Sequence, residues 1–233
     1  LSDCGITGEG YATLTSALKS NPSHLVELDL RGNDPGDSGV ELLTDLHNLL
    51  DVENLQTLKL LKSDAAEESC AYLTSVLNKN PLLLTELDLS GKKPGDSGVK
   101  QFCALLEDSH CKLKTLKLND SSITAEGCAA LTSGLRSNPS HLIELNLSGN
   151  KLGDSGVKYI SDLLKDPHCK LQRLLLNNSS ITGEGCAALM SALSSNPSHL
   201  IELNLSGNKL GDSGVDYISA LLQNPHCKLQ KLL

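Results

Sequence analysis

The sequence predicts an α/β solenoid, with a parallel β-sheet along one face of the stacked units and α-helices along the other. Three observations predict this fold. The string HLIELNLSGNKLGDSGV occurs verbatim at residues 141–157 and again at 199–215. A Leu-x-x-Leu-x-Leu frame recurs at half the spacing of these copies, and apolar residues at helical spacing follow each frame. A pattern that recurs at a fixed period indicates a repeat architecture.

Two kinds of unit alternate along the chain. The first-kind unit at 142–170 reads LIELNLSGNKLGDSGVKYISDLLKDPHCK, and the second-kind unit at 171–199 reads LQRLLLNNSSITGEGCAALMSALSSNPSH. The first step between frames is slightly longer than the later steps, which are all equal. The frames open at Leu25, Leu55, Leu84, Leu113, Leu142, Leu171, Leu200 and Leu229.

Each unit begins with a strand pattern and continues with a helix pattern. Apolar residues at alternating positions of the frame favour a short strand that is buried on one face. Apolar residues three and four apart, such as Val157, Ile160, Leu163 and Leu164, favour a helix. A single unit cannot cover its own leucines, so we expect the units to stack and to bury them against one another.

The string Gly-Asp-Ser-Gly, which surrounds the nucleophile of many serine proteases, occurs at Asp37, Asp96, Asp154 and Asp212. Each copy lies where the turn after the strand gives way to the helix. An aspartate there accepts backbone N–H bonds at a helix start and opposes the positive end of the helix dipole, while the flanking glycines relax the turn. A protease would need a general base and an orienting carboxylate beside one serine. Because nothing distinguishes one copy from the others, we interpret Ser155 as a first-turn residue.

Composition disfavours several functional classes. The formal net charge is -8 and no Lys or Arg residues cluster, which argues against a nucleic-acid partner. No run approaches the roughly 18 apolar residues of a membrane span, and residues 1–10 show no signal-peptide pattern. No Gly-x-x-x-x-Gly-Lys-Ser/Thr string is present. We therefore expect no membrane partner, and neither a cofactor nor a metal in this segment.

The cysteines follow the repeat in two registers. Cys111, Cys169 and Cys227 end first-kind units, and members of one register are separated by a whole intervening unit. That separation exceeds the roughly 4.4–6.8 Å between Cα atoms that a disulfide needs. We expect buried free thiols, and hence a reducing, cytoplasmic location. The histidine before each cysteine, such as His168, is interpreted as a surface residue because zinc needs four converging groups.

These units resemble the ribonuclease-inhibitor class of leucine-rich repeats over essentially the whole chain. The pattern L-x-x-L-x-L-x-x-N-x-L-G-D-x-G followed by P-x-C-x-L matches the unit that opens at Leu142, and the helical pattern G-C-x-x-L matches 127–131 and 185–189. The resemblance implies a horseshoe with a concave sheet and convex helices. We expect residues 1–233 to form a single leucine-rich-repeat domain that is a fragment of a larger protein.

In this class an asparagine after the strand satisfies the buried backbone of the turns. It is present at Asn33, Asn150 and Asn208, whereas Lys92 replaces it in one unit. We expect smaller polar groups to fill the same ladder in second-kind units. These groups are Cys4, Ser63, Ser121 and Ser179. The pattern is least regular over 25–83, where one unit lacks the Pro-x-Cys ending and the next has Ala65 in place of Ile.

Among such arrays the chain looks most like the C-terminal repeats of NOD-like receptors, especially the expanded fish-type members that include inflammasome sensors. The resemblance rests on phrases such as ELNLSGNKLGDSGV and ITGEGCAALMSAL. It implies a non-catalytic, cytoplasmic domain that senses ligands or holds the receptor's own nucleotide-binding module inactive, with ATP bound only in that other module. The alternatives are a ribonuclease-inhibitor-like protein that blocks an enzyme, or a general scaffold for protein interactions.

The candidate partner surface is the concave face of the sheet. Strand positions that alternate with the buried leucines carry acids in first-kind units and bases in second-kind units, and neighbouring parallel strands lie about 4.8 Å apart. The charges are therefore predicted to pair sideways. One interpretation is a self-neutralising ladder that keeps the sheet hydrated, and the other is a polar platform for a protein partner. The contact candidates are Arg31, Lys59, Leu61, Asp88, Lys117, Glu144, Arg173, Asn177 and Glu202.

Overall fold

The computed structural model of the chain describes residues 1, 4–20, 27–30, 33, 57–59, 86–91, 93–107, 111, 113–138, 141–196 and 199–233. Short strands alternate with helices of 12 or 13 residues along most of the described chain. The elements are α1 (Gly8–Ser20), β1 (Glu27–Asp29), β2 (Thr57–Lys59), β3 (Glu86–Asp88), α4 (Gly95–Glu107), β4 (Thr115–Lys117), α5 (Ala125–Ser137), β5 (Glu144–Asn146), α6 (Gly153–Leu164), β6 (Arg173–Leu175), α7 (Gly183–Ser195), β7 (Glu202–Asn204), α8 (Gly211–Leu222) and β8 (Lys231–Leu232).

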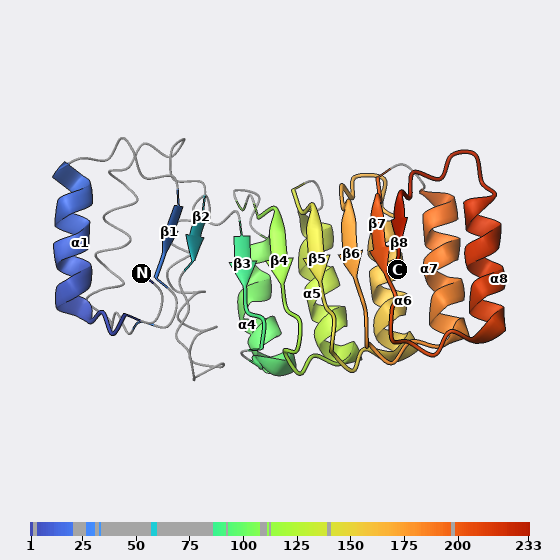
Figure 1. The fold of residues 1–233 in the computed structure, drawn as a ribbon, viewed down its shortest axis with the longest axis horizontal. Helices are drawn as coiled ribbons and strands as arrows, with labels where there is room; N and C mark the ends of the chain where they lie inside the picture. The colour runs from blue at the N-terminus through green and yellow to red at the C-terminus, as the bar shows by residue number, and fades with distance from the viewer. Residues whose placement is uncertain are drawn as a thin grey trace.

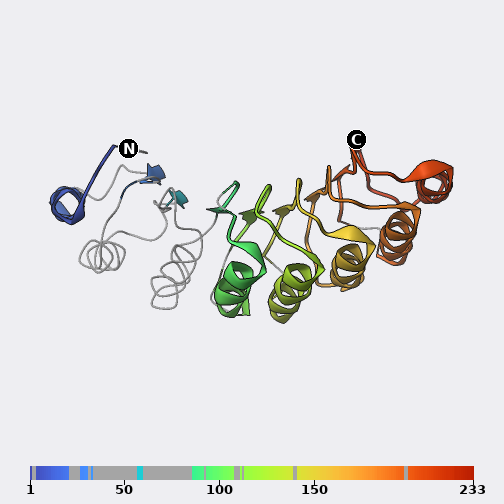
Figure 2. The same ribbon diagram turned by 90° about the horizontal axis from the view of Figure 1, so that it is seen from below.

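The strands form parallel sheets in sequence order. β1 pairs with β2, and β3 to β8 form a six-stranded sheet in which every neighbour follows in the sequence. The register steps by one unit, so that Leu116, Leu145 and Leu174 lie side by side across β4, β5 and β6. Figure 1 shows strands of this sheet in front of helices α4 to α6, with α7 and α8 to the right of β8, and Figure 2 shows the strands on the inner side of a curved row of helices. The predicted solenoid is confirmed.

Leucines fill the space between sheet and helices, as the low aromatic content requires. The central leucine of β4, β5, β6 and β7 is fully buried in each case. On the helix side, Val157 and Ile160 of α6 are also fully buried. The single Phe, Phe102, is fully buried in α4. Stacking therefore buries, against the neighbouring unit, the apolar side chains that a single unit would expose.

The asparagine ladder is confirmed at its three described positions. Asn150 Oδ1 accepts hydrogen bonds from the backbone N–H groups of Ser121 and Ile123, both at 3.0 Å. Its Nδ2 donates to the carbonyl groups of Leu118 and Leu147, at 2.7 and 2.8 Å. Asn33 and Asn208 make the same four kinds of bond. Buried backbone groups that the turn leaves unpaired are thus satisfied by a side chain from the following unit.

Serine completes the ladder in second-kind units. Ser121 is fully buried, and its Oγ donates to the carbonyl of Leu89 in the preceding unit at 3.1 Å. Ser179 makes the equivalent contact with Leu147 at 3.5 Å. The expectation that smaller polar groups fill the ladder is confirmed for these two serines. Ser63 and Lys92 lie outside the described residues.

The role predicted for the aspartate of the Gly-Asp-Ser-Gly string needs a correction. Asp154 lies in the first turn of α6, but the cap of that helix is Leu152, which provides no side-chain hydrogen bond. The Asp154 carboxylate instead accepts bonds from the start of α7 in the next unit: from Thr182 N–H at 2.8 Å, Thr182 Oγ1 at 2.6 Å and Gly185 N–H at 3.1 Å. Asp96 binds the start of α5 in the same way. The aspartate therefore caps the neighbouring helix rather than its own.

This contact explains the glycine of the second-kind helix. A β-carbon at Gly185 would lie 2.4 Å from Asp154 Oδ1, and one at Gly127 would lie 2.3 Å from Asp96 Oδ1. A larger residue at either place would push the carboxylate off the N–H group that it binds. The glycine before the aspartate has a different function, because Gly153 has a φ of +60°, which L-residues with side chains rarely adopt.

The cysteines of the described residues are free thiols, and five of them are buried as predicted, whereas Cys4 is exposed and Cys227 is only partly buried. Burial raises the pKa of Cys103 and of Cys128 to about 12, so both thiols are protonated near neutral pH. Cys169 is buried, whereas the preceding His168 is exposed, which confirms the interpretation of the His-Cys dipeptide there. Cys70 and His110 lie outside the described residues.

Candidate functional site

The concave face presents the first and third residues of each strand, because the middle leucine points into the core. One row of facing positions runs from Glu86 through Thr115, Glu144, Arg173 and Glu202 to Lys231. A second row runs from Asp88 through Lys117, Asn146 and Leu175 to Asn204. Each of the short strands β3 to β7 therefore offers two side chains to a partner.

Ion pairs join the strands of this face in the sideways direction that the sequence predicts. Lys117 Nζ lies 2.8 Å from Glu86 Oε1, and Lys231 Nζ lies 2.6 Å from Glu202 Oε1. Arg173 binds Glu144 through Nη2 and also through Nε, the latter at 3.0 Å. Each pair joins the acid of a first-kind strand to the base of the second-kind strand that follows it.

These pairs neutralise the face without stabilising it greatly. The hydrogen bond to Glu86 raises the pKa of Lys117, so the ammonium group stays charged over the physiological range. The bases are well exposed, with 50 % of the Arg173 side chain and 55 % of the Lys231 side chain accessible. Their acids are more enclosed, with 15 % of the Glu144 side chain and 18 % of the Glu202 side chain accessible. Ion pairs with a solvent-exposed member contribute about 0–1 kcal/mol. The predicted ladder is therefore present, and its basic side chains stay accessible.

Hydrogen bonds between amides and hydroxyls form a further row just after the strands. Ser90 Oγ donates to Asn119 Oδ1 at 2.6 Å, and Asn146 Nδ2 donates to the same oxygen at 3.2 Å. Ser148 Oγ donates to Oδ1 of Asn177, which lies in the turn after β6. Asn177 is one of the predicted contact residues, whereas neither serine is among them. The sequence could have identified both serines, because each follows the Leu-x-Leu frame of its unit at the same offset.

The structure brings most of the predicted contact residues onto one surface. Asp88, Lys117, Glu144, Arg173 and Glu202 lie on adjacent strands of the six-stranded sheet. Lys59 lies in β2, where the structure describes its backbone but not its side chain. Arg31 and Leu61 lie outside the described residues. Their selection as partner contacts stays a prediction.

Ser155 lies in the first turn of α6, as predicted, and is exposed there. Within the described ranges, no group of three His, Cys, Asp or Glu side chains is arranged to hold a metal ion. Over the same ranges, no helix has the length and apolar character needed to cross a membrane. The strand residues of the concave face display hydrogen-bonding groups and charges on a curved sheet.

The parallel sheet, the leucine core and the asparagine ladder define a leucine-rich-repeat solenoid. A Leucine Rich repeat family model matches residues 21–43, 109–131, 138–161 and 196–219. The chain is built of leucine-rich repeats, and its relatives include proteins of two kinds. It is 41 % identical over its whole length to NACHT, LRR and PYD domains-containing protein 3 of Rattus norvegicus, and 39 % identical over its whole length to ribonuclease inhibitor of Mus musculus.

The chain spans only part of these relatives. It corresponds to 22 % of the rat protein and to 50 % of the mouse inhibitor. It is also 40 % identical over its whole length to NACHT, LRR and PYD domains-containing protein 12 of Mus musculus. Among solved structures, Leiomodin-1 Actin-Binding Site 2 superimposes with a TM-score of 0.52 and 19 % identity, covering 66 % of this chain and 85 % of that one. That likeness concerns the fold alone.

Proposed function

We propose that this chain is a non-catalytic regulatory repeat domain of a cytoplasmic NOD-like receptor. In this proposal the concave face binds a protein partner or the receptor's own nucleotide-binding module, and contributes to autoinhibition or recognition in inflammasome signalling. The observation that carries the proposal is a continuous polar surface with accessible basic side chains, in a chain related over its whole length to NACHT, LRR and PYD proteins.

The geometry of the face suits a protein ligand better than a small molecule. The strands lay their polar side chains in two rows along a curve, and the ion pairs hold those side chains in position before a partner arrives. Leu175 adds a half-buried apolar contact between Asn146 and Asn204. A partner that carries acids opposite Arg173 and Lys117 would gain complementary charge, which speeds association and fixes the binding orientation.

The test measures binding of the chain to the isolated NACHT module of the rat relative at low salt. We expect K117E/R173E to raise the dissociation constant at least about tenfold, because each substitution places an acid beside existing acids. The matched control is K158E, since Lys158 is exposed on α6, in the helix layer on the other side of the core. Circular dichroism checks that the variants keep the fold. Unchanged affinity of K117E/R173E at low salt, or no binding by the original chain, would overturn the proposal.

A second candidate is a ribonuclease-inhibitor-like blocker of an enzyme, which the 39 % identity to the mouse inhibitor favours. The absence of Trp argues against it, because Trp is enriched among the residues that dominate tight interfaces. A direct assay separates the two candidates. Inhibition of ribonuclease A by the purified chain at micromolar concentration would favour the blocker, and full ribonuclease activity would favour the receptor domain.

A further inference from the structure

The helices of the solenoid are held together in pairs. Asp96 joins α4 to the start of α5, and Asp154 joins α6 to the start of α7, each through three hydrogen bonds. At the other end of the helices, Asn196 Nδ2 donates to the carbonyl groups of Leu164 and Asp166 at 3.0 and 2.9 Å. Asn138 Nδ2 donates to the carbonyl of Cys111 at 3.0 Å. Each pair, α4 with α5 and α6 with α7, is therefore bonded near both ends.

The alternation follows from the sequence of the two units. The second-kind helix begins at a threonine, Thr124 or Thr182, whose N–H and hydroxyl both reach the aspartate of the preceding unit. The first-kind helix begins at Leu152 or Leu210, which offers no hydroxyl. The place of the aspartate is taken in second-kind helices by an exposed glutamate, Glu184 in α7. The bonded contact can therefore form only from a first-kind unit to the second-kind unit after it.

The junctions from a second-kind to a first-kind unit lack this bonding in the helix layer. Among the described residues, no hydrogen bond or ion pair joins 125–137 to 153–170. Between α7 and α8 the corresponding contact is one weak bond, from Cys186 Sγ to the carbonyl of Gly214 at 3.5 Å. On the sheet side the same junctions are firmly held, because Asn150 bonds to Ser121, Ile123 and Leu118 across the α5–α6 junction.

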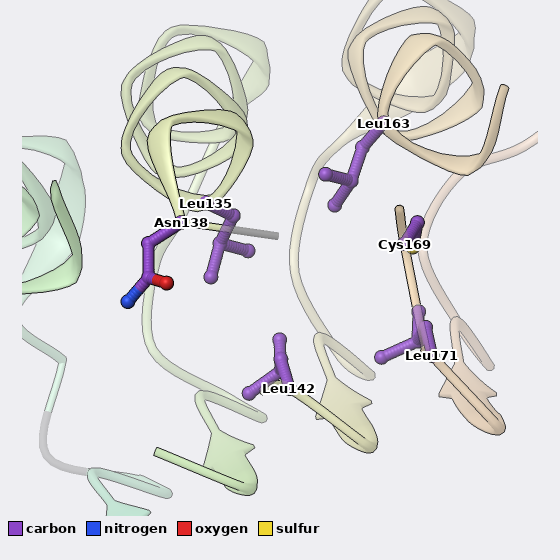
Figure 3. A pocket seen from close by; sticks show the side chains of 6 residues that line it. All are labelled: Leu135, Asn138, Leu142, Leu163, Cys169 and Leu171. Atoms are coloured by element: carbon purple, nitrogen blue, oxygen red, sulfur yellow. The ribbon is translucent and has the colours of Figure 1, made fainter. Parts of the chain in front are cut away.

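Small voids lie at both of these junctions in the described part of the chain. A void of about 10 Å³ lies between the α5 and α6 units, where Leu135 and Leu163 extend from the two helices and Leu142 and Leu171 face them from the strand side (Figure 3). A similar void of about 10 Å³ separates the α7 and α8 units. Outside the core, an open groove of about 540 Å³ runs between α5 and α6. Atoms that line a gap lose dispersion contacts on that side, which lowers the cost of separating the helices.

We propose that the α5–α6 junction is a built-in seam, at which the helix layer opens while the sheet and its asparagine ladder stay intact. The bonded pairs α4–α5 and α6–α7 move as two blocks. Because the opening is confined to the convex side, it changes the curvature of the concave face. This inference concerns the mechanics of the solenoid and does not depend on the proposed function.

The chain carries its own reporters of such an opening. Cys128 is fully buried in α5 and faces the seam, since a β-carbon at Gly156 of α6 would lie 3.4 Å from its Sγ. Cys103 is buried in α4 and faces the bonded junction, since a β-carbon at Gly134 of α5 would lie 3.6 Å from the Cβ atom of Cys103. Burial raises the pKa of both thiols to about 12, so neither reacts appreciably until its junction opens.

The experiment is alkylation of the full chain by iodoacetamide under native conditions, with mass spectrometry of each cysteine peptide over time. We expect Cys128 to react at least about tenfold faster than Cys103. The variant S161C supplies a second reporter, because Ser161 is buried at the position in α6 that Cys103 holds in α4. It faces the bonded α6–α7 junction and is expected to react as slowly as Cys103. Equal rates at all three sites, or slower reaction at Cys128, would overturn the proposal.

A variant pair separates local opening from general loss of stability. D96N weakens the α4–α5 contact and is expected to raise the reaction rate of Cys103 several-fold. The rate of Cys128 should rise by a clearly smaller factor, which reflects the loss of the Asp96 charge that helps to raise the pKa of Cys128. D212N is the matched control, because Asp212 holds the same position in α8 and makes no hydrogen bond among the described residues. It should change neither rate. If D96N accelerates both thiols equally, the junctions do not open separately and the seam is refuted.

Discussion

At the residue scale, the fold depends on a few side chains that complete the backbone hydrogen bonding of a neighbouring unit. Asn150 is the clearest case, since it is 1 % exposed and uses both amide atoms. It satisfies backbone groups that would otherwise be buried without partners, which costs about 1–3 kcal/mol for each group. A single side chain therefore stabilises two consecutive turns at once.

Replacing this asparagine tests that account. We expect N150A to lower the free energy of unfolding by at least about 2 kcal/mol, because two backbone N–H groups and the Leu118 carbonyl lose the Asn150 side chain, and the Leu147 carbonyl keeps the long bond from Ser179 Oγ. Urea denaturation followed by circular dichroism measures the change. N146A is the control, since Asn146 lies only partly buried on the concave face, and its loss should cost less than about 1 kcal/mol. Similar losses of unfolding free energy in the two variants would contradict the conclusion that the asparagine ladder stabilises the fold.

The sequence predicts the role of some of these residues correctly and that of others wrongly, and the difference has a physical reason. Asn150 was predictable because the repeat frame fixes its place after the strand. Asp154 was recognised as a helix-capping residue but assigned to the wrong helix, because spacing within one unit does not say which neighbouring backbone reaches the carboxylate. The bonding depends on how two units stack, and that information appears only once α6 and α7 lie side by side. Arg31 and Leu61 lie outside the described residues, so their assignment stays a prediction.

At the element scale, the contact between α6 and α7 makes stability depend on pH. Burial opposes ionisation of Asp154, but the bonds from the Thr182 hydroxyl and N–H and from the Gly185 N–H outweigh it, so the pKa falls below its ordinary value of 3.8. A carboxyl group whose pKa is lower in the folded state stabilises the fold above its ordinary pKa. That contribution is lost as the pH falls from the ordinary value through the lowered one.

We therefore expect D154N to be less stable than the original chain near neutral pH, by about 0.5–2 kcal/mol as for other helix caps. The difference should shrink as the pH falls below 3.8, because the original carboxyl group then becomes protonated. Thermal melts across this pH range measure the effect. D212N serves as the comparison, and its stability should follow that of the original chain after allowance for one charge. A D154N deficit that persists unchanged in acid would exclude the carboxylate as its cause.

At the scale of the whole molecule, the ion pairs of the concave face influence binding more than folding. Sheet and helices are held by buried leucines and by the asparagine ladder, whereas Arg173 and Lys231 are half exposed. Because the fold and the surface charges depend on different residues, the charge pattern of the concave face can change without a large loss of stability. It also leaves the two interpretations of the face compatible, because a ladder that keeps the sheet hydrated also holds its side chains ready for a partner.

The corresponding prediction is that E144Q/R173Q unfolds with a free energy within about 1 kcal/mol of the original chain, because both charges of a pair whose base is half exposed are removed together and neither is left unpaired. Urea denaturation at low and at high salt measures this. The small difference should vanish at high salt, where surface charges are screened. A loss well above about 1 kcal/mol would mean that the face contributes structurally, and that the K117E/R173E binding test needs a milder pair of substitutions.

The cap that each aspartate provides for the following helix also constrains how such a chain can lengthen. Duplicating a whole pair of units inserts one Asp-bearing unit together with one Thr-bearing unit, so every aspartate still meets a threonine. Duplicating a single unit would place two units of one kind next to each other. A duplicated first-kind unit would leave an aspartate facing a leucine, and a duplicated second-kind unit would leave a threonine with no aspartate to bind. The verbatim copies at 141–157 and 199–215 stand one pair of units apart, the spacing that preserves every such partnership.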